Sequence, residues 1–184
     1  TGEISLGAGV GTSGSTIGGG LKEKNFLGKG INLDTNLEIS EDSLKGKFIY
    51  ARPNFAYSDN TLFTSLESST TDNLSDFGYK VSNVGFSLGT SFEQYENLFF
   101  KPEIDLNVED LKTNSNASQN LKKQKGTYED IYVNYSLTYD MRDSYYRPSK
   151  GHKTNFYQTI PMVSDNGEVA NILTHSRYKP MRSS

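Results

Sequence analysis

Hydrophobic and polar residues alternate along most of the chain, with a period of two. Residues 31–40, INLDTNLEIS, carry apolar side chains at one set of positions (Ile31, Leu33, Leu37 and Ile39) and polar side chains at the other (Asn32, Asp34, Asn36, Glu38 and Ser40). Successive side chains of a strand point to opposite faces, so this segment predicts a strand with one apolar and one polar face. A soluble sandwich would turn the apolar face inward, whereas a membrane barrel would turn it outward to lipid.

The same period predicts about ten strands, each near the length that a tilted transmembrane strand needs. They are expected at residues 2–11, 15–24, 31–40, 45–51, 61–69, 81–92, 101–110, 129–140, 152–161 and 168–178. No segment shows a sustained helical period. The fold class is therefore predicted to be all-β, as an antiparallel transmembrane β-barrel of the outer membrane.

The connections between these strands alternate in kind, which favours a barrel. One set is polar and covers residues 12–16, 40–43, 70–78, 113–126 and 163–167. The other set carries aromatic residues, glycine or proline and covers residues 25–30, 52–60, 93–97 and 144–151. Consecutive hairpins place the two sets at opposite ends, as in outer-membrane barrels. The aromatic residues near strand ends then suit a girdle at the membrane surface: Tyr57, Tyr95, Phe99, Tyr145 and Tyr146.

Composition supports a barrel with a wet interior. Only 34% of the 184 residues are hydrophobic, fewer than a soluble core of this size usually needs, while 12% are aromatic. In a barrel, only the lipid-facing half of each strand must be apolar, and the many Asp and Glu residues would line the lumen. The net charge of −3 argues against a nucleic-acid partner. The lack of cysteine excludes disulfides and thiol catalysis.

Three motifs could suggest other chemistry, and none is convincing. Residues 9–14, GVGTSG, match a dinucleotide-binding pattern, but the following STIGGG does not begin a helix. His152 and His175 are the only histidines and lie on different predicted strands, without the close spacing of metal-ligand pairs. A charged cluster at residues 140–143 is interpreted as a solvated network at a strand end. We expect no enzyme activity, no metal and no cofactor.

Four motifs, read in order, resemble the barrel domain of the BamA family, the central subunits of the outer-membrane protein assembly machinery. They are TGEISLGAGVGTS, KEKNFLGKG, RPNF and TYDMRDSYYRPSKG. The family's first turn, Asn-Phe-x-Gly-x-Gly, is matched by Asn25, Phe26, Gly28 and Gly30. Its Pro-x-x-Gly turn is matched by Pro148 and Gly151. Its Pro-Tyr-Phe segment appears as Pro53, Asn54 and Phe55, a partial departure.

The resemblance implies that residues 1–180 are the N-terminal portion of the barrel, with about ten of sixteen strands. Family members carry periplasmic POTRA domains before the barrel. Their lumen-plugging loop motif belongs to the part of the barrel beyond this sequence. Residues 181–184 do not continue the strand pattern, and we interpret them as a fragment end or an engineered scar.

The resemblance also implies a function: folding and inserting β-barrel proteins through a lateral gate at the first strand. The gate strand that would pair with a client comprises Ile4, Ser5, Leu6, Gly7, Ala8, Gly9, Val10 and Gly11. Glycine inside a strand weakens it by roughly 0.5–1 kcal/mol relative to alanine, which suits a strand that must separate. The alternative interpretation is that these glycines only relieve crowding or permit curvature.

The partners implied are outer-membrane lipid, unfolded β-barrel clients and accessory lipoproteins, in the outer membrane of a Gram-negative bacterium. Three alternatives stay open at this point. They are a related two-partner-secretion translocator, a porin-like diffusion channel and a soluble β-sandwich binding module. POTRA domains upstream would exclude the last two.

Overall fold

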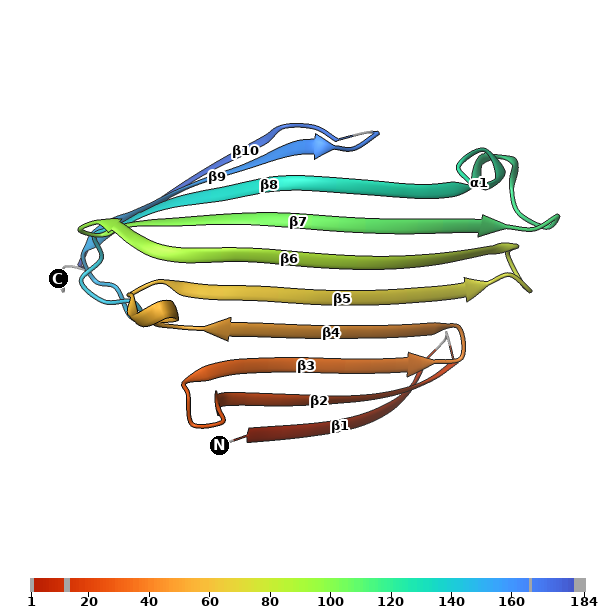
Figure 1. Ribbon diagram of the computed structural model, residues 1–184, viewed down its shortest axis with the longest axis horizontal. Helices are drawn as coiled ribbons and strands as arrows, with labels where there is room; N and C mark the ends of the chain where they lie inside the picture. The colour runs from red at the N-terminus through yellow and green to blue at the C-terminus, as the bar shows by residue number, and fades with distance from the viewer. Residues whose placement is uncertain (1, 12–13, 166, 181–184) are drawn as a thin grey trace.

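A computed structural model describes residues 2–11, 14–165 and 167–180, and shows one antiparallel sheet of ten strands in chain order (Figure 1). All ten predicted strands are confirmed, several with longer ends than the sequence suggested. The strands are β1 (Gly2–Gly11), β2 (Gly14–Phe26), β3 (Ile31–Ser40), β4 (Ser43–Arg52), β5 (Thr61–Asn73), β6 (Tyr79–Tyr95), β7 (Leu98–Thr113), β8 (Gly126–Asp140), β9 (Gly151–Val163) and β10 (Ala170–Tyr178). Residues 181–184 lie outside the described residues.

Two short helical segments interrupt the connections. A 3₁₀ turn covers Phe55–Tyr57, and α1 covers Gln119–Lys123. α1 lies within the polar connection at residues 113–126, where the sequence showed no sustained helical period. The backbone N–H of Leu121 donates to the hydroxyl of Ser118 at 3.3 Å, which caps the first turn. Neither segment is long or apolar enough to cross a membrane, and the described residues contain no other helix that is.

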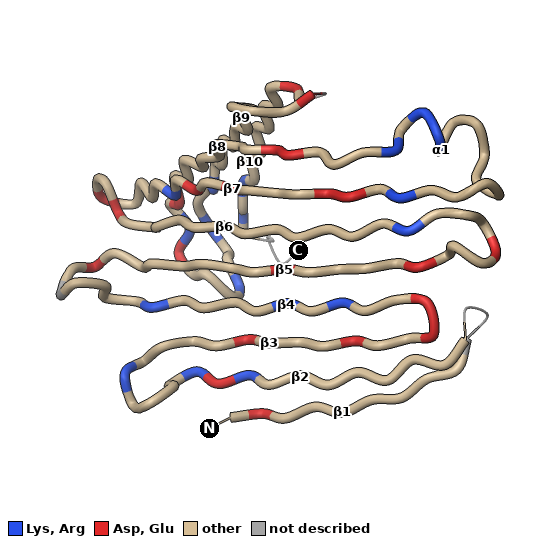
Figure 2. Tube along the Cα trace, turned by 45° about the vertical axis from the view of Figure 1, so that its right-hand side comes forward, with Lys and Arg blue, Asp and Glu red and all other residues tan. Residues whose placement is uncertain are grey.

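The hairpins place the two kinds of connection at opposite ends of the sheet, as predicted (Figure 1). The sheet also curls, so that β9 and β10 turn away from the plane of β1 to β7 (Figures 1 and 2). Within the described residues, β1 and β10 are the two edges and do not pair with each other. The structure is thus an open part of a barrel wall.

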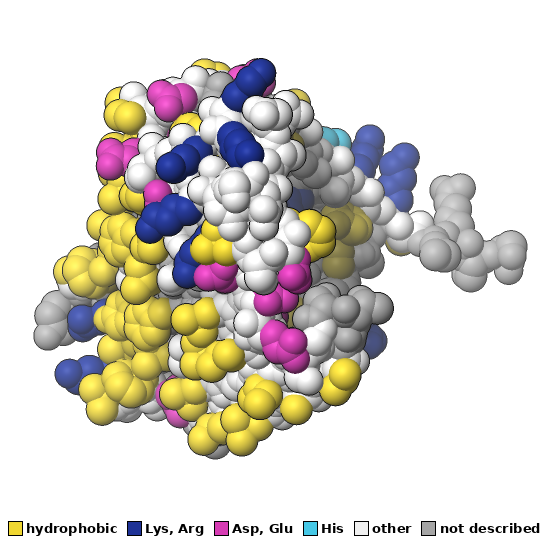
Figure 3. Space-filling view, turned by 90° about the vertical axis from the view of Figure 1, so that its right-hand side faces the viewer, with side chains coloured by type: hydrophobic (Ala, Val, Ile, Leu, Met, Phe, Trp, Pro, Cys, Tyr) yellow, Lys and Arg dark blue, Asp and Glu magenta, His cyan; other side chains and the backbone are white. Residues whose placement is uncertain are grey.

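The two faces of the sheet differ in chemistry. Cross-strand partners share a face, and the register aligns an apolar row across six strands: Thr35, Phe48, Leu66, Phe86, Leu106 and Ile131. Leu66 is 48% exposed and Leu106 39% exposed, although both lie in the middle of the sheet. In Figure 3, hydrophobic side chains gather along the outer side of the curled sheet. This outer face is the one suited to lipid.

The opposite face is polar and makes its own bonds. The amide of Asn134 donates to Asp105 at 2.5 Å, and the hydroxyls of Ser65 and Ser87 are 2.6 Å apart. Lys47 forms an ion pair with Glu67. In the described part of the chain, the only buried apolar residues are Ile31, Leu111 and Ala117. A single layer with so little core is not a soluble sandwich, so that alternative is wrong.

The strand β3 shows the alternation of the two faces in detail. Leu37 is 50% exposed and lies on the apolar face, opposite Gly19 and Gly46. Asp34, on the polar face, pairs with Lys22 at 3.3 Å and accepts a 3.4 Å hydrogen bond from Asn36. The period of two in the sequence therefore predicted the two faces correctly.

Candidate functional site

The strand β1 is an edge of the sheet and has a partner on one side only. It pairs with β2 from Gly2, opposite Glu23, to Gly11, opposite Gly14. No strand among the described residues pairs with its other side. An unpaired strand edge presents a row of backbone donors and acceptors, which is a template for the addition of another strand.

The apolar side chains of β1 contact little. Ile4 is 78% exposed, Leu6 86% and Val10 87%, roughly twice the exposure of the outer-face residues in the middle of the sheet. Ala8 shares this face and lies opposite Ile17 on β2. These side chains therefore hold β1 against its neighbour only weakly.

Gly7 and Gly9 of β1 lie on the polar face, on the same side of the strand as Ser5. A Cβ atom added to Gly7 or Gly9 would meet no heavy atom within 4 Å. In the described part of the chain, crowding therefore does not account for these two glycines. Their effect is to leave the inner face of β1 bare. Gly11 is the last residue of the strand and lies opposite Gly14.

The sequence interpretation missed a second set of glycines, Gly18 to Gly20 on β2. They lie opposite Gly7, Leu6 and Ser5 respectively. Here crowding does matter. A Cβ atom at Gly19 would lie 3.1 Å from a methyl group of Leu6, and one at Gly20 would collide with the Asn36 side-chain oxygen. The signal was present in the sequence as GGG, but which side chains lie over these glycines depends on the register.

The first turn after β2 owes its shape to the motif residues Asn25, Phe26, Gly28 and Gly30. The backbone N–H of Gly28 donates to the carbonyl of Asn25 at 3.0 Å, and that of Gly30 donates to the Asn25 side chain at 2.6 Å. Gly28 and Gly30 have φ angles of 70° and 66°, a conformation that favours glycine. The motif is therefore a structural turn in this chain.

The turn between β8 and β9 contains Pro148 and is closed by Asp143. The Asp143 carboxylate accepts hydrogen bonds from the Ser149 hydroxyl (2.5 Å), the Ser149 N–H (2.8 Å) and the Lys150 N–H (3.1 Å). These bonds lower the pKa of Asp143 to about 2. Gly151 has a φ of 100°, and a Cβ atom there would collide with the Met141 carbonyl oxygen, so no other residue fits without a shift of the backbone.

The charged cluster at this turn is not the solvated network that the sequence predicted. The guanidinium of Arg142 donates to the Asp140 carboxylate at 2.7 and 2.6 Å. The side chains are only 13% and 5% exposed. Arg142 also lies 5.5 Å from the ring centre of Tyr145. The pair is buried because the turn folds back over the end of β8 and excludes water from it.

The two histidines, which are 23 positions apart in the sequence (175 − 152), meet in the structure. The centres of their rings are 5.8 Å apart, and Tyr139 lies at the same distance from His152 on the other side. Among the described residues, no group of three or more His, Cys, Asp or Glu side chains could hold a metal ion. The dinucleotide-like motif continues into the strand β2 instead of a helix.

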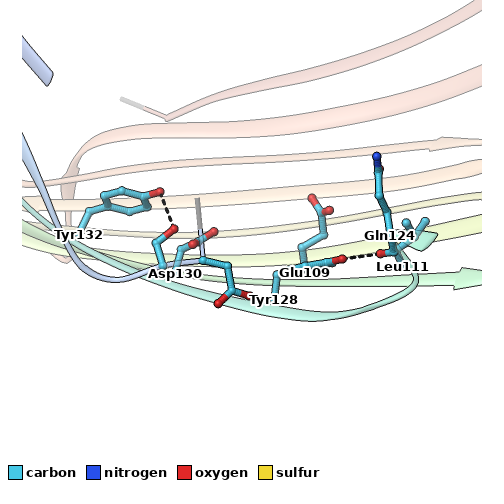
Figure 4. A pocket seen from close by; sticks show the side chains of 8 residues that line it. Glu109, Leu111, Gln124, Tyr128, Asp130 and Tyr132 are labelled. Carbon is cyan, nitrogen blue, oxygen red and sulfur yellow. Dashed lines mark hydrogen bonds between the residues drawn. The ribbon is translucent and has the colours of Figure 1, made fainter. Parts of the chain in front are cut away.

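A hollow of about 450 Å³ lies on the polar face, at the end of the sheet where α1 lies (Figure 4). Its lining includes three carboxylates, from Glu109, Asp130 and Asp165. Tyr128 donates to the carbonyl of Gln124 at 2.6 Å beside it. The hollow fits the predicted acidic lining of the lumen, and it holds no constellation that points to catalysis.

Comparisons with known proteins agree with the fold. The family model for the Omp85 superfamily domain matches residues 25–181. The crystal structure of BamA from Haemophilus ducreyi lacking POTRA domains 1–3 is similar, with 24% identity and a TM-score of 0.60. The match covers 90% of this chain and 35% of that chain, so this chain spans about a third of that protein's length. A search of curated proteins finds no match. The family match begins after β1, so it does not bear on the predicted gate strand.

Proposed function

This chain belongs to the Omp85 superfamily and is part of an Omp85-type outer-membrane protein, and from that premise we propose a function in the assembly of other outer-membrane proteins. Residues 1–180 would form the N-terminal portion of the barrel of an assembly factor. β1 would be the moving side of a lateral gate at which client barrels fold and insert. The role is not enzymatic.

The observation that carries the proposal is the combination of an unpaired edge with weak side-chain contacts. β1 offers backbone groups along its free side, while its apolar side chains are largely exposed. Gly7 and Gly9 leave its inner face bare, although no heavy atom within 4 Å requires them to be small. A strand built in this way holds its neighbours mainly through backbone hydrogen bonds, and an incoming strand can supply the same bonds.

Strand addition needs no cofactor or external energy source. Each client strand gains backbone hydrogen bonds at the edge, since lipid leaves no other partner for its N–H and C=O groups. The burial of the client's apolar side chains in the bilayer supplies the driving force. The partners proposed on this basis are outer-membrane lipid, unfolded β-barrel clients and accessory lipoproteins in a Gram-negative outer membrane.

A reversible covalent lock tests the proposal in the full-length protein. A cysteine at Leu6 or Ala8 is paired with one on the final strand of the barrel, in several registers, because a disulfide needs Cα atoms roughly 4.4–6.8 Å apart. The chain contains no cysteine that could compete. Oxidation should abolish client insertion into vesicles while the barrel stays folded, and a reductant should restore it.

The matched control is a lock between two strands of the wall. The register places Val84 of β6 directly opposite Val108 of β7. A disulfide between cysteines at positions 84 and 108 should leave insertion unchanged. If the gate lock also leaves insertion at its normal rate, the proposed role of β1 is wrong. A translocator that exports a partner through its lumen would keep its transport activity under the gate lock.

A further inference from the structure

The outer face of β8, β9 and β10 changes character toward the end of the sheet that carries the β8–β9 turn. An apolar row crosses five strands: Phe92, Phe100, Leu137, Phe156 and Leu173. The row before it on this face, toward the middle of the sheet, is a chain of hydrogen bonds from Tyr135 through Gln158 to Asn171. Two residues beyond the apolar row, the next row on the same face contains Tyr139, Thr154 and His175. The row after that pairs His152 with Arg177. Apolar side chains therefore give way to donors within two rows.

The donors form one cluster. The rings of Tyr139, His152 and His175 lie side by side, with 5.8 Å between the centres of successive rings. The hydroxyl of Thr154 is 2.9 Å from Nδ1 of His175, which orients that imidazole, and no side chain among the described residues makes a hydrogen bond with its Nε2. Arg177 lies directly opposite His152 across the strand pair and is exposed. Three nitrogen-bearing side chains thus share one patch of the outer face.

We propose that His152, His175 and Arg177 bind the phosphate of an anionic glycerophospholipid at the membrane surface. The inference rests on the membrane placement that the proposed function assumes. A guanidinium presents a planar fork of N–H donors that matches a phosphate, and an imidazole N–H adds a further donor. Tyr139 offers the amphipathic ring that is typical of the interface between membrane and water.

The charges around the patch select an anion. Among the described residues, Arg177 forms no ion pair with a carboxylate. Asp140, at the end of β8, lies on the opposite face and is already bound to Arg142. On the outer face of β8, the only carboxylate is that of Glu129, ten residues from Tyr139 (139 − 129). A cation would have to approach Arg177 with no carboxylate to offset the repulsion.

The depth of the patch fits a headgroup. From Phe156 to His152 is four residues, or roughly 14 Å along a strand, and a tilt of about 45° reduces this to roughly 10 Å along the membrane normal. The exposed rings of Tyr145 and Tyr146 belong to the turn at the same end. In the membrane placement that the proposed function assumes, this end of the sheet is periplasmic, so the phosphate belongs to the leaflet on that side.

Lipid binding by the full-length protein in detergent tests the proposal. Native mass spectrometry would follow titrations with phosphatidylglycerol, phosphatidylcholine and inorganic phosphate. Wild-type protein should prefer phosphatidylglycerol. Each basic group near an anionic headgroup contributes about fivefold in affinity, so His175→Gln with Arg177→Gln should lower that preference by roughly tenfold or more. Equal binding by wild type and the double variant overturns the proposal, as does saturation by inorganic phosphate alone at the same concentration.

Lys153→Gln is the matched control, because it removes a positive charge from the neighbouring residue on the opposite face of β9. This variant should keep the wild-type preference. If it loses the preference as fully as the double variant does, net charge rather than the patch controls binding, and the proposal is wrong. Protein that inserts clients into vesicles but does not prefer an anionic lipid overturns this site alone. Protein that inserts no clients overturns the proposed function as well.

Discussion

Two hairpins of the sheet have the same backbone pairing and very different side chains. β6 and β7, with 17 and 16 residues, place Val84 opposite Val108 and Phe86 opposite Leu106. β1 and β2, with 10 and 13 residues, place Leu6 opposite Gly19 and Gly7 opposite Gly18. The first hairpin is a wall held by side chains as well as hydrogen bonds. The second has fewer such pairs, Ile4 opposite Leu21 among them, and depends more on its backbone hydrogen bonds.

The difference shows how one sheet can contain both permanent and separable seams. A cross-strand pair of large side chains contributes roughly 0.2–1 kcal/mol relative to alanine, and a seam with several such pairs accumulates a barrier to opening. A glycine pair contributes none of this, and it leaves the hydrogen bonds intact. A seam formed on the free side of β1 would carry the same glycines, and another strand could replace its hydrogen bonds, so that seam suits exchange and the β6–β7 type suits permanence.

The largest effect is expected from a charge on the outer face of the wall. Leu106→Arg should destabilise the barrel by ~2–4 kcal/mol if residue 106 lies near the middle of the bilayer, because the guanidinium would face hydrocarbon. Asn107→Arg, one residue away on the polar face, should cost much less. Urea titrations of the full-length protein folded into lipid vesicles measure both. Equal costs would contradict the assignment of the two faces.

A glycine of the wall should tolerate substitution less well than a glycine of the edge. Gly89 on β6 lies under the ring of Phe63, and a Cβ atom there would collide with that ring and approach the Pro102 carbonyl oxygen to 2.7 Å. Gly89→Ala should therefore cost about 1–3 kcal/mol through overpacking. Gly9→Ala on β1 is the control and should be tolerated, since its added methyl meets open space. The same unfolding measurement compares them.

Adding a side chain to the bare inner face of β1 should make this edge strand pair more stably, as the strands of the wall do. Gly7→Val is expected to stabilise β1 by roughly 0.5–1 kcal/mol, because valine favours extended backbone and glycine does not. Client insertion should slow, while the folded barrel becomes more resistant to urea. Faster insertion, or a loss of stability, would show that Gly7 serves a purpose other than keeping β1 separable.

The smallest effect concerns a turn outside both hairpins. The pKa of Asp143 is lowered to about 2 by its bonds to Ser149 and Lys150, below the ordinary value of about 3.9. The carboxylate therefore stabilises the turn fully above about pH 4, and this contribution is lost as the pH falls through 2. The carbon shift of the carboxyl group in NMR should report that midpoint. Asp143→Asn should remove the transition and leave both hairpins unchanged.

Much of this fold could be predicted from local pattern. The alternation in residues 31–40 was sufficient to identify β3 and the face to which Leu37 and Asp34 belong. The motifs at residues 25–30 and 144–151 identified two turns, because positive φ angles and close backbone approach leave few residues other than glycine. The candidate gate strand was also visible as a glycine-rich first strand, although its role stays a prediction.

What the sequence determined by itself is therefore the set of strands, their order and the chemistry of their two faces. These follow from interactions between residues that are near in the chain. Only the tertiary structure decided which residues face each other across strands: Val84 with Val108, Phe63 over Gly89, and His152 beside His175. A shift of two residues in register preserves the alternation on both faces yet changes every such pair, so the pattern cannot specify them. The burial of Asp140 with Arg142 likewise depends on how a turn folds back over a strand end.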